Sequence, residues 1–367
     1  MSEGWFSKMN KYIPFLKLKP NEIMALKELE TTSKQQLTPF FDFPYKKKRT
    51  EDEFKKTAND MILKINRYLK DVPYFYLDNF DVDSNLTIDG GNNYIYLLNA
   101  CDGLFVVPVI SIDRSSEHMQ SVCNAKDNRH LISDRVALRF VEEDFNNFNV
   151  VADEIEELLA DTFSKFTCID LIIDCRICSD QNIDSLVSKI TAFIKDFNST
   201  YPISKAIVTG SSISASIGDI LKTNNEVELP RVELYIFDKV STQIGDDFNL
   251  VLGDYGIVSP DYSDLSIDPR LILSVTTSKF FYTFDRSHYV IRGGSLKKHK
   301  RGYGQYNDAA EIIVAKPFFR GSDYSFGDNF IEEKSRSIGS NVTPSTILKP
   351  TINSHVAYML NGTIPSV

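Results

Sequence analysis

The stretch Arg135-Val-Ala-Leu-Arg-Phe140 begins the part of the sequence that decides the fold. The amphipathic residues 147–163 follow it, and the stretch Cys168-Ile-Asp-Leu-Ile-Ile-Asp174 comes last. The first and last stretches are short apolar runs with β-branched residues, which is typical of buried strands. The residues between them place Val151 and Ile155 at helical spacing. A strand, a helix and a second strand in this order predict two parallel strands joined by a crossover helix.

The same unit recurs along most of the chain, with strand starts roughly 25 to 45 residues apart. The other predicted strands are residues 12–18, 37–43, 73–78, 104–111, 205–210 and 249–254. The other predicted helices are residues 22–36, 51–70, 93–100, 115–124, 183–197 and 230–240, the last with Pro230 in its first turn. Eight such strands in an α/β chain predict a TIM-like (β/α)8 barrel.

An open doubly wound sheet is the alternative architecture. Such sheets usually carry a glycine-rich turn after the first strand, whereas the turn here is Lys17-Leu-Lys-Pro-Asn-Glu22, without glycine. We therefore expect the barrel to span residues 11–260 and an irregular C-terminal extension to span residues 261–367. In the extension we predict two strands, a short helix and a loop, at residues 271–284, 287–292, 307–318 and 321–345 respectively.

Composition limits the classes of partner. The chain has 41 basic and 50 acidic residues and a net charge of −9, which makes a nucleic-acid partner unlikely on electrostatic grounds. The basic runs Lys46-Lys-Lys-Arg49 and Lys297-Lys-His-Lys-Arg301 are interpreted as solvated segments. The polar N-terminus lacks a signal-peptide core, and no apolar run is long enough to span a membrane. These features predict a cytoplasmic protein without a membrane partner.

Charged side chains follow several predicted strands. In a barrel, function concentrates where strands end and enter their helices. The polar residues at these ends are Lys17, Lys19, Asp42, Asp78, Ser111, Asp113, Arg139, Asp174, Arg176, Ser211, Ser212, Asp254 and Tyr255. Arginines there could hold an anion through paired hydrogen bonds, and carboxylates could bind Mg²⁺ or transfer protons. In the alternative interpretation, these charges pair with one another and close the barrel mouth.

Other catalytic motifs are absent from the sequence. Cys175-Arg-Ile-Cys178 is a lone CxxC without the second ligand pair of a structural zinc site. The histidines have no HExxH spacing, and no GxSxG, Walker loop or GxGxxG occurs. The chain also has three other cysteines, and all five are interpreted as reduced thiols. No metal site is predicted, and any cofactor stays unknown.

Seven sequence blocks together resemble a known family. They are Tyr12-Ile-Pro-Phe-Leu-Lys-Leu-Lys-Pro-Asn-Glu22, Leu37-Thr-Pro-Phe-Phe-Asp42, Arg231-Val-Glu233, Gly253-Asp-Tyr-Gly256, Arg292-Gly293, Tyr324-Ser-Phe-Gly-Asp328 and Asn353-Ser-His355. In this order the chain resembles the beta protein family, named for a T4-type phage protein. The resemblance implies a phage or mobile-element setting and an extension that folds back over the barrel mouth. It adds the candidate binding residues Glu22, Glu233, Arg292, Asp328 and His355.

Two functions are compatible with these features. The first is a component of phage–host conflict, in antiviral defence, which acts through recognition of a protein partner. The second is a hydrolase or phosphodiesterase, with or without Mg²⁺, that acts on a phosphate-bearing substrate. In the second, Lys17, Asp174 and Asp254 are the candidate catalytic residues, and Asp174 and Asp254 must converge in one cleft at the barrel mouth. A nucleic-acid-binding module is a third reading, which needs a contiguous basic surface.

Overall fold

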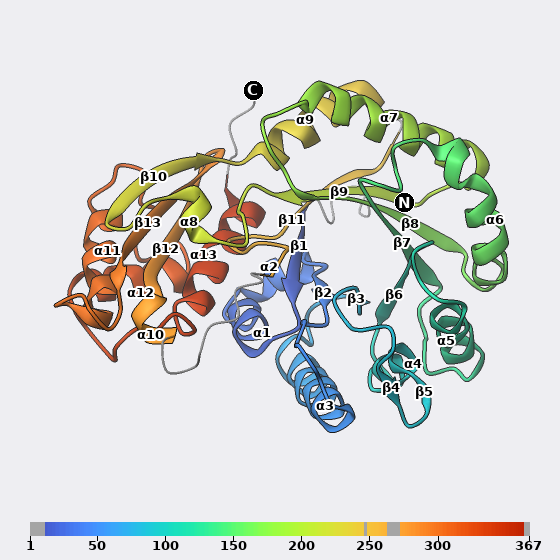
Figure 1. The fold of residues 1–367 in the computed structure, drawn as a ribbon, viewed down its shortest axis with the longest axis horizontal. Coiled ribbons are helices and arrows are strands. Elements are labelled where there is room, and N and C mark those ends of the chain that lie inside the picture. Colours follow the sequence, from blue (N-terminus) through green and yellow to red (C-terminus); the bar gives the residue numbers. More distant parts are fainter. Residues whose placement is uncertain (1–11, 246–247, 263–271, 363–367) are drawn as a thin grey trace.

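The computed structural model describes residues 12–245, 248–262 and 272–362. Eight parallel strands close into a barrel in chain order (Figure 1). They are β1 (Tyr12–Lys17), β2 (Phe40–Asp42), β3 (Phe75–Asp78), β6 (Val106–Ile110), β7 (Arg135–Val141), β8 (Cys168–Ile177), β9 (Lys205–Ser211) and β11 (Leu250–Asp254). The predicted (β/α)8 barrel is confirmed.

Helices connect the strands and surround the barrel (Figure 1). They are α1 (Pro20–Lys27), α2 (Thr31–Gln35), α3 (Glu51–Tyr68), α4 (Asn93–Asn99), α5 (Ser116–Asp127), α6 (Phe148–Lys165), α7 (Ile183–Thr200), α8 (Ile217–Ile220) and α9 (Val232–Ile244). Side-chain caps explain several starts, such as the capping box of Thr50 and Glu53 at α3. The single helix predicted over residues 22–36 is two helices, α1 and α2.

The barrel has an inner and an outer apolar layer. Ile13 and Phe15 alternate with outward-facing neighbours and belong to the packed interior, whereas Tyr12 and Leu16 pack in the layer shared with the helices. Gly253 is required inside the barrel, because a Cβ there would lie 2.7 Å from the Phe15 ring and 2.8 Å from Thr209. The interior is therefore a filled core below the mouth.

The extension is built on a three-stranded antiparallel sheet in the order β10-β13-β12. Its strands are β10 (Asn225–Pro230), β12 (Thr277–Phe284) and β13 (Ser287–Ser295). Figure 1 shows β10, which comes from the connection between β9 and α9, lying beside β13. The prediction that Pro230 begins a helix is wrong, since Pro230 ends this strand. The extension therefore also recruits residues before position 260.

The two faces of this sheet pack on different cores. Phe280 and Tyr282 belong to a separate cluster within the extension, while Phe281 and Val290 belong to the cluster that surrounds the barrel. Alternation along β12 therefore puts Lys279 on the barrel-facing side with Phe281. The sheet is a partition between the barrel and the extension's helices.

Three longer helices complete the extension, namely α11 (Gln305–Val314), α12 (Phe326–Ser335) and α13 (Leu348–Asn361). The prediction of a loop throughout residues 321–345 is wrong over α12, whose N-cap Ser325 accepts from the Asp328 amide. Helix α13, which the sequence analysis did not predict, contacts α1, α12 and β12 and so joins the extension to the barrel. The short elements are β4 (Thr87–Ile88), β5 (Gly91–Asn92), α10 (Ile272–Val275) and a 3-10 turn at Gly302–Gly304.

Candidate functional site

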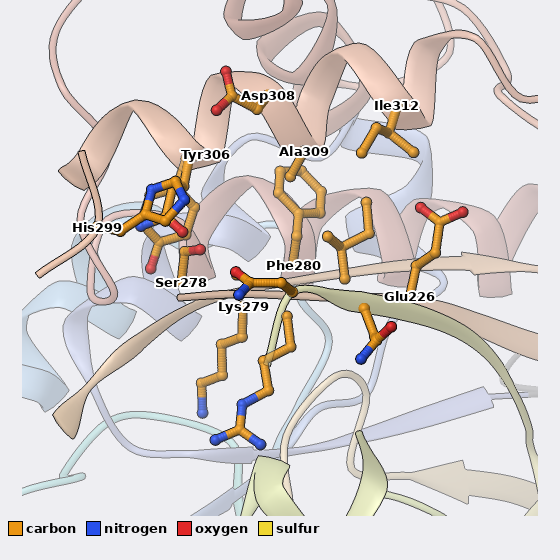
Figure 2. Close-up of a pocket in the computed structure, with 15 residues that line it drawn as sticks. Glu226, Ser278, Lys279, Phe280, His299, Tyr306, Asp308, Ala309 and Ile312 are labelled. Carbon is orange, nitrogen blue, oxygen red and sulfur yellow. The ribbon is translucent and has the colours of Figure 1, made fainter. Parts of the chain in front are cut away.

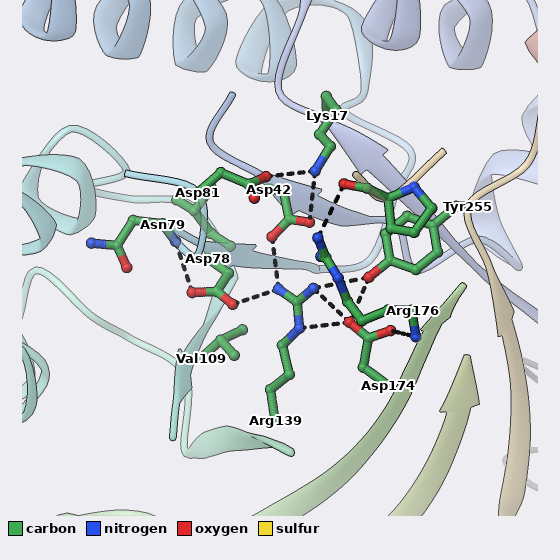
Figure 3. Close-up of polar contacts among 12 residues, drawn as sticks. Lys17, Asp42, Asp78, Asn79, Asp81, Val109, Arg139, Asp174, Arg176 and Tyr255 are labelled. Carbon is green, nitrogen blue, oxygen red and sulfur yellow. Dashed lines mark hydrogen bonds and ion pairs between the residues drawn. The ribbon is translucent and has the colours of Figure 1, made fainter. Parts of the chain in front are cut away.

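Arg139 is the centre of a buried ion-pair network at the barrel mouth (Figure 3). Its side chain is 1% exposed. Nη1 donates to Asp42 and to Asp78, both at 2.8 Å, and Nη2 donates to Asp174 at 2.6 Å. Nη2 also donates to the Tyr255 hydroxyl at 2.9 Å, and that hydroxyl donates to Asp174 at 2.5 Å. Four different strand ends thus meet on one guanidinium.

The carboxylates of this network have further basic partners. Lys17 contacts Asp42 at 3.5 Å and Asp81 at 2.6 Å, and Arg114 contacts Asp78 at 3.2 Å. The Phe80 ring lies 4.3 Å from the Arg139 guanidinium, a cation–π contact. The charges at the strand ends therefore pair with one another and close the centre of the mouth, as the second interpretation of the sequence expected.

Arg176 borders this network without entering its centre. Its amide donates to Asp174 at 2.9 Å, and its Nη2 donates to Asp261 at 2.6 Å. Its backbone is left-handed, with φ of 49°, a conformation that costs free energy in a residue with a Cβ. Arg176 therefore ties the end of β8 to the segment after β11.

Burial and charge compete at the carboxylates. At Asp42 burial favours the neutral acid, but Arg139 and Lys17 outweigh it and lower the pKa. At Asp78 burial prevails over Arg114 and Arg139 and raises the pKa. Burial opposes the charge of Arg139 too, yet the surrounding carboxylates raise its pKa. The carboxylates and Arg139 thus stabilise one another's charges in a site that is shielded from water.

A second buried network joins the barrel to the last helix. Arg231 donates to Asp254 and, at 2.9 Å, to Glu233. Asp254 also accepts from the Tyr12 hydroxyl at 2.7 Å and lies 3.1 Å from His355 Nε2. These charged groups are nearly inaccessible, with Arg231 at 0% and His355 at 1% exposure. The network fastens α13 to the ends of β1 and β11.

The other ring nitrogen of His355 continues this network into the extension sheet. His355 Nδ1 lies 2.8 Å from the Thr283 hydroxyl, which lies 3.0 Å from His288 Nδ1. Burial lowers the pKa of His288 well below its usual value. At Asp254 burial would raise the pKa, but His355 and Arg231 hold it below its ordinary value.

The expected convergence of Asp174 and Asp254 in one cleft is wrong. Asp174 is held by Arg139 and Tyr255, whereas Asp254 is held by Arg231 and His355, so the two carboxylates belong to different networks. Their acceptor positions are already used by buried donors. The assignment of catalysis to Lys17, Asp174 and Asp254 stays a prediction.

Two further predicted binding residues lie in the extension. Asp328 is fully buried and accepts from Tyr282 at 2.6 Å and from Ser354 at 3.0 Å. Arg292 donates to the Leu221 carbonyl at 2.5 Å. The structure thus distributes the predicted residues over four places: the Arg139 network with Arg176 at its border, the Asp254 network, the extension and, for Glu22, a cleft beside α1.

A cleft of about 680 Å³ lies between the barrel mouth and the extension. Its barrel side includes Lys17, Lys19, Glu22 and Tyr262, and its extension side includes Lys279 together with Phe281, Ile347, Leu348 and Thr351. Asn21 donates to the Ser345 carbonyl at 2.9 Å across one edge. The cleft exists only because the two parts of the chain meet there.

Glu22 is the unusual group in this cleft. It lies in the first turn of α1, is 4% exposed, and its Oε2 has no hydrogen-bond partner among the described residues. Burial raises the pKa of its carboxyl to about 7. A buried polar atom without a partner costs free energy, so a hydrogen bond from a ligand to this atom would lower that cost.

Lys19 and Lys279 are two further amines in the same cleft. Burial lowers the pKa of Lys19 and of Lys279. Neither forms an ion pair with a carboxylate of the described residues; Lys19 lies 5.6 Å from the Tyr262 ring. Lys279 is nevertheless an exposed residue, so its desolvation is partial.

A smaller cavity of about 370 Å³ lies in the extension, with Tyr306, Asp308 and His299 among its lining residues (Figure 2). Burial raises the pKa of the Tyr306 hydroxyl. Figure 2 shows Lys279 extending from the sheet on the side away from Tyr306 and Ala309. Lys279 therefore points toward the barrel.

Lys19 and Lys279 are not among the site residues predicted from the sequence. Lys19 lies with Lys17 at the end of the first predicted strand, but only Lys17 is a predicted site residue. Lys279 is the single charged residue in the apolar run Thr277-Ser-Lys-Phe-Phe-Tyr-Thr-Phe284. A lone charge at an alternate position of a buried strand is a signal that could have identified it.

We searched residues 12–245, 248–262 and 272–362 for metal-binding groups and for membrane-spanning helices. No group of three or more His, Cys, Asp or Glu residues there could hold a metal ion. No helix in those ranges is long and apolar enough to cross a membrane. Cys175 and Cys178 are free thiols, and both are buried.

Fold and site together define a TIM-type (β/α)8 barrel against which a C-terminal extension packs. A profile of the Beta protein family matches residues 12–361, and the chain belongs to that family. This confirms the resemblance seen in the sequence blocks. No curated protein matches the chain.

Similar solved structures include a chitinase from Chromobacterium violaceum ATCC 12472. It has 10% identity and a TM-score of 0.32, with 84% of this chain and 91% of that chain covered. Dispersin B has 9% identity and a TM-score of 0.25, with 95% of this chain and 98% of that chain covered. At these TM-scores the similarity does not bear on function.

Proposed function

We propose that the cleft between barrel and extension is the active site of a hydrolase in which Glu22 transfers protons. The observation that carries the proposal is the buried Glu22 Oε2 without a partner, in a cleft large enough for a small molecule. A carboxyl with a pKa of about 7 is present in both protonation states near neutral pH. That is the condition for efficient general acid–base catalysis.

The position of Glu22 in the fold supports the same role. It follows β1 by one turn of helix, at the end of the barrel where active sites of this fold lie. The carboxylates of the Arg139 network form ion pairs with arginine and lysine, whereas Glu22 lines the cleft without an ion pair to a described residue, and Lys19 and Lys17 only partly offset the effect of its burial. Among the predicted binding residues, Glu22 is thus the one suited to exchange a proton with a ligand.

The test combines a titration with a kinetic assay. Carbon-13 NMR of labelled glutamate side chains should show one carboxyl that titrates near pH 7 in the wild-type protein and is missing in Glu22→Gln. With p-nitrophenyl phosphate and bis(p-nitrophenyl) phosphate as substrates, Glu22→Gln should lower kcat at least about 100-fold with little change in KM. The exposed Glu30→Gln is the matched control. A Glu22→Gln variant with wild-type kcat, or no carboxyl that titrates near pH 7, would contradict the proposal.

A second candidate function is recognition of a protein partner in antiviral defence, in the cytoplasm. Its supporting observation is an apolar surface where Leu63 is 66% and Phe105 is 59% exposed. Two adjoining hollows share Asn66 and Leu104 beside these side chains. Exposed apolar side chains that cluster at hollows are typical of protein-binding surfaces.

Phage plating separates the two functions. Cells carrying the wild-type gene, the double variant Leu63→Ser/Phe105→Ser or the variant Glu22→Gln would be infected in parallel. Loss of protection only in the double variant favours protein recognition, and loss only in Glu22→Gln favours catalysis. Equal plating on all strains and on cells without the gene would exclude a defensive role against the phages used.

A further inference from the structure

We propose that the cleft binds the phosphate group of a small phosphorylated organic molecule, with Lys19 from the barrel and Lys279 from the extension as its direct cationic partners. This inference rests on the proposed function and names the substrate class of the same site. The phosphate site is complete only when barrel and extension are packed together, because each contributes one of the two amines.

The first supporting observation is a pair of like charges on neighbouring strands. In the antiparallel register, Lys279 on β12 lies opposite Arg292 on β13. Like charges directly opposite one another destabilise a sheet. Neither side chain forms an ion pair with a carboxylate of the described residues, and Arg292 is anchored on the Leu221 carbonyl. No carboxylate of the described residues compensates this repulsion, and a bound anion would.

The second observation is the matching amine across the cleft. Lys19 lies at the N-cap of α1 and lines the same cavity as Lys279. Its neighbour Lys17 is neutralised by Asp42 and Asp81, whereas Lys19 forms no ion pair with a described carboxylate and is attracted only at longer range by Glu22 and Asp81. Burial disfavours the charged form of both unpaired amines. A doubly charged phosphate monoester would supply both with the missing counter-charge.

The third observation concerns the remaining walls of the cleft. Much of the lining is apolar and comprises Ile213, Ile217, Ile220, Ile257, Phe281, Ile347 and Leu348. The volume of about 680 Å³ is that of a site for a whole small molecule, and it exceeds the needs of a free phosphate ion. The fitting ligand is therefore a phosphate ester with an apolar body. The carboxyl of Glu22, when protonated, can donate a hydrogen bond to a phosphate or ester oxygen.

Calorimetric titration of the full-length protein tests this directly, with phenyl phosphate and inorganic phosphate as probes. We expect phenyl phosphate to bind at least 10-fold more tightly than inorganic phosphate, because only the ester also buries its ring. Lys279→Gln and Lys19→Gln should each weaken binding of phenyl phosphate at least 10-fold. Lys300→Gln removes the same charge from an exposed position of the extension and should leave binding unchanged.

Lys279→Arg controls for damage to the fold, because it keeps the charge on β12 and should retain most of the affinity. Equal affinity for the two probes would mean that the site takes free phosphate and would overturn the organic ligand. No binding of either probe, or full binding in both lysine variants, would overturn the phosphate site.

The phosphate site and the proposed catalysis can fail separately. Glu22→Gln should retain binding of phenyl phosphate while it abolishes turnover. If the lysine variants lose binding but Glu22→Gln hydrolyses esters at the wild-type rate, the phosphate site stands and the role of Glu22 falls. If Glu22→Gln loses turnover of an ester while phenyl phosphate does not bind, the role of Glu22 stands and the phosphate site falls.

Discussion

The imidazole Nε2 of His355 lies 3.1 Å from Oδ2 of Asp254, although 101 residues separate the two in the chain. Asp254 ends the last barrel strand, and His355 lies in the middle of the last helix. Both side chains are almost completely buried. The contact therefore fastens the extension to the barrel and helps to form the cleft between them.

Removal of this contact should destabilise the whole protein. In His355→Leu, Asp254 and the Thr283 hydroxyl lose a buried partner, which should lower the free energy of unfolding by about 3–5 kcal/mol. Urea unfolding followed by circular dichroism measures this change. His130→Leu is the control, because His130 pairs with Asp102 on the exposed surface. Equal unfolding midpoints for the two variants would contradict a fastening role.

Replacement of Arg139 should be more harmful than replacement of an exposed arginine. Arg139→Met leaves Asp42, Asp78 and Asp174 without their shared cation in a dry site, and the expected loss is about 3–5 kcal/mol or failure to fold. Arg301→Met removes an exposed pair with Asp308 and should change little. Soluble yield and chemical unfolding are the measurements. If Arg139→Met unfolds with the wild-type midpoint, the mouth network does not stabilise the barrel.

Glu22 should make stability depend on pH in a defined direction. Its folded pKa of about 7 lies above the ordinary value of 4.5, so the folded state binds the proton more tightly. The resulting stabilisation is complete below about pH 4.5 and is lost as pH rises through 7, a change of roughly 3 kcal/mol. Glu22→Gln lacks this contribution, so its stability relative to the wild type should rise between pH 4 and pH 9. If the free energies of unfolding of the wild type and of Glu22→Gln change with pH in the same way over that range, the pKa of Glu22 is not raised.

Gly327 should be irreplaceable in the block Tyr324-Ser-Phe-Gly-Asp328. A Cβ at this position would lie 2.1 Å from the Pro350 carbonyl oxygen and 2.7 Å from the Ser354 nitrogen, both backbone atoms of α13. Gly327→Ala should therefore push α12 away from α13 and cost about 2 kcal/mol or more. Gly91→Ala is the control, since the nearest atom there is 3.7 Å away. Thermal unfolding of both variants should separate them clearly.

Lys279 should reduce stability in the absence of an anion. Because it lies opposite Arg292, Lys279→Met should raise the free energy of unfolding by up to about 1 kcal/mol in low salt. Added phosphate should stabilise the wild-type protein and leave Lys279→Met unaffected. A lower melting temperature for Lys279→Met in phosphate-free, low-salt buffer would contradict this account of the cross-strand pair.

Much of the barrel could be predicted because its signals are local. Short apolar runs and helical spacing indicated all eight strands, and the strand ends brought Lys17, Asp42, Asp78 and Asp174 around Arg139, as the topology required. What could not be predicted was which charge pairs with which. Asp174 and Asp254 look alike in sequence, yet one binds Arg139 and the other binds Arg231.

The extension was predicted less well, because its elements depend on one another. Strand β10 is polar on its exposed side and is ordered by pairing with β13, more than 50 residues later in the chain. Helix α12 has a polar composition and is held between α11 and α13. Neither β10 nor α12 has a regular spacing of apolar residues that would distinguish it in the sequence from the neighbouring loops.

The sequence by itself determined the barrel, the charged ring at its mouth and the family, because periodicity and strand order are properties of consecutive residues. Only the tertiary structure decided that Glu22 Oε2 would be buried without a hydrogen-bond partner among the described residues and that Lys19 and Lys279 would line one cleft. Burial depends on what packs over a residue. The chain that encloses Glu22 is brought to α1 by contacts such as Asn21 to Ser345, which are 324 residues apart. The chemistry of the cleft therefore arises when the extension meets the barrel.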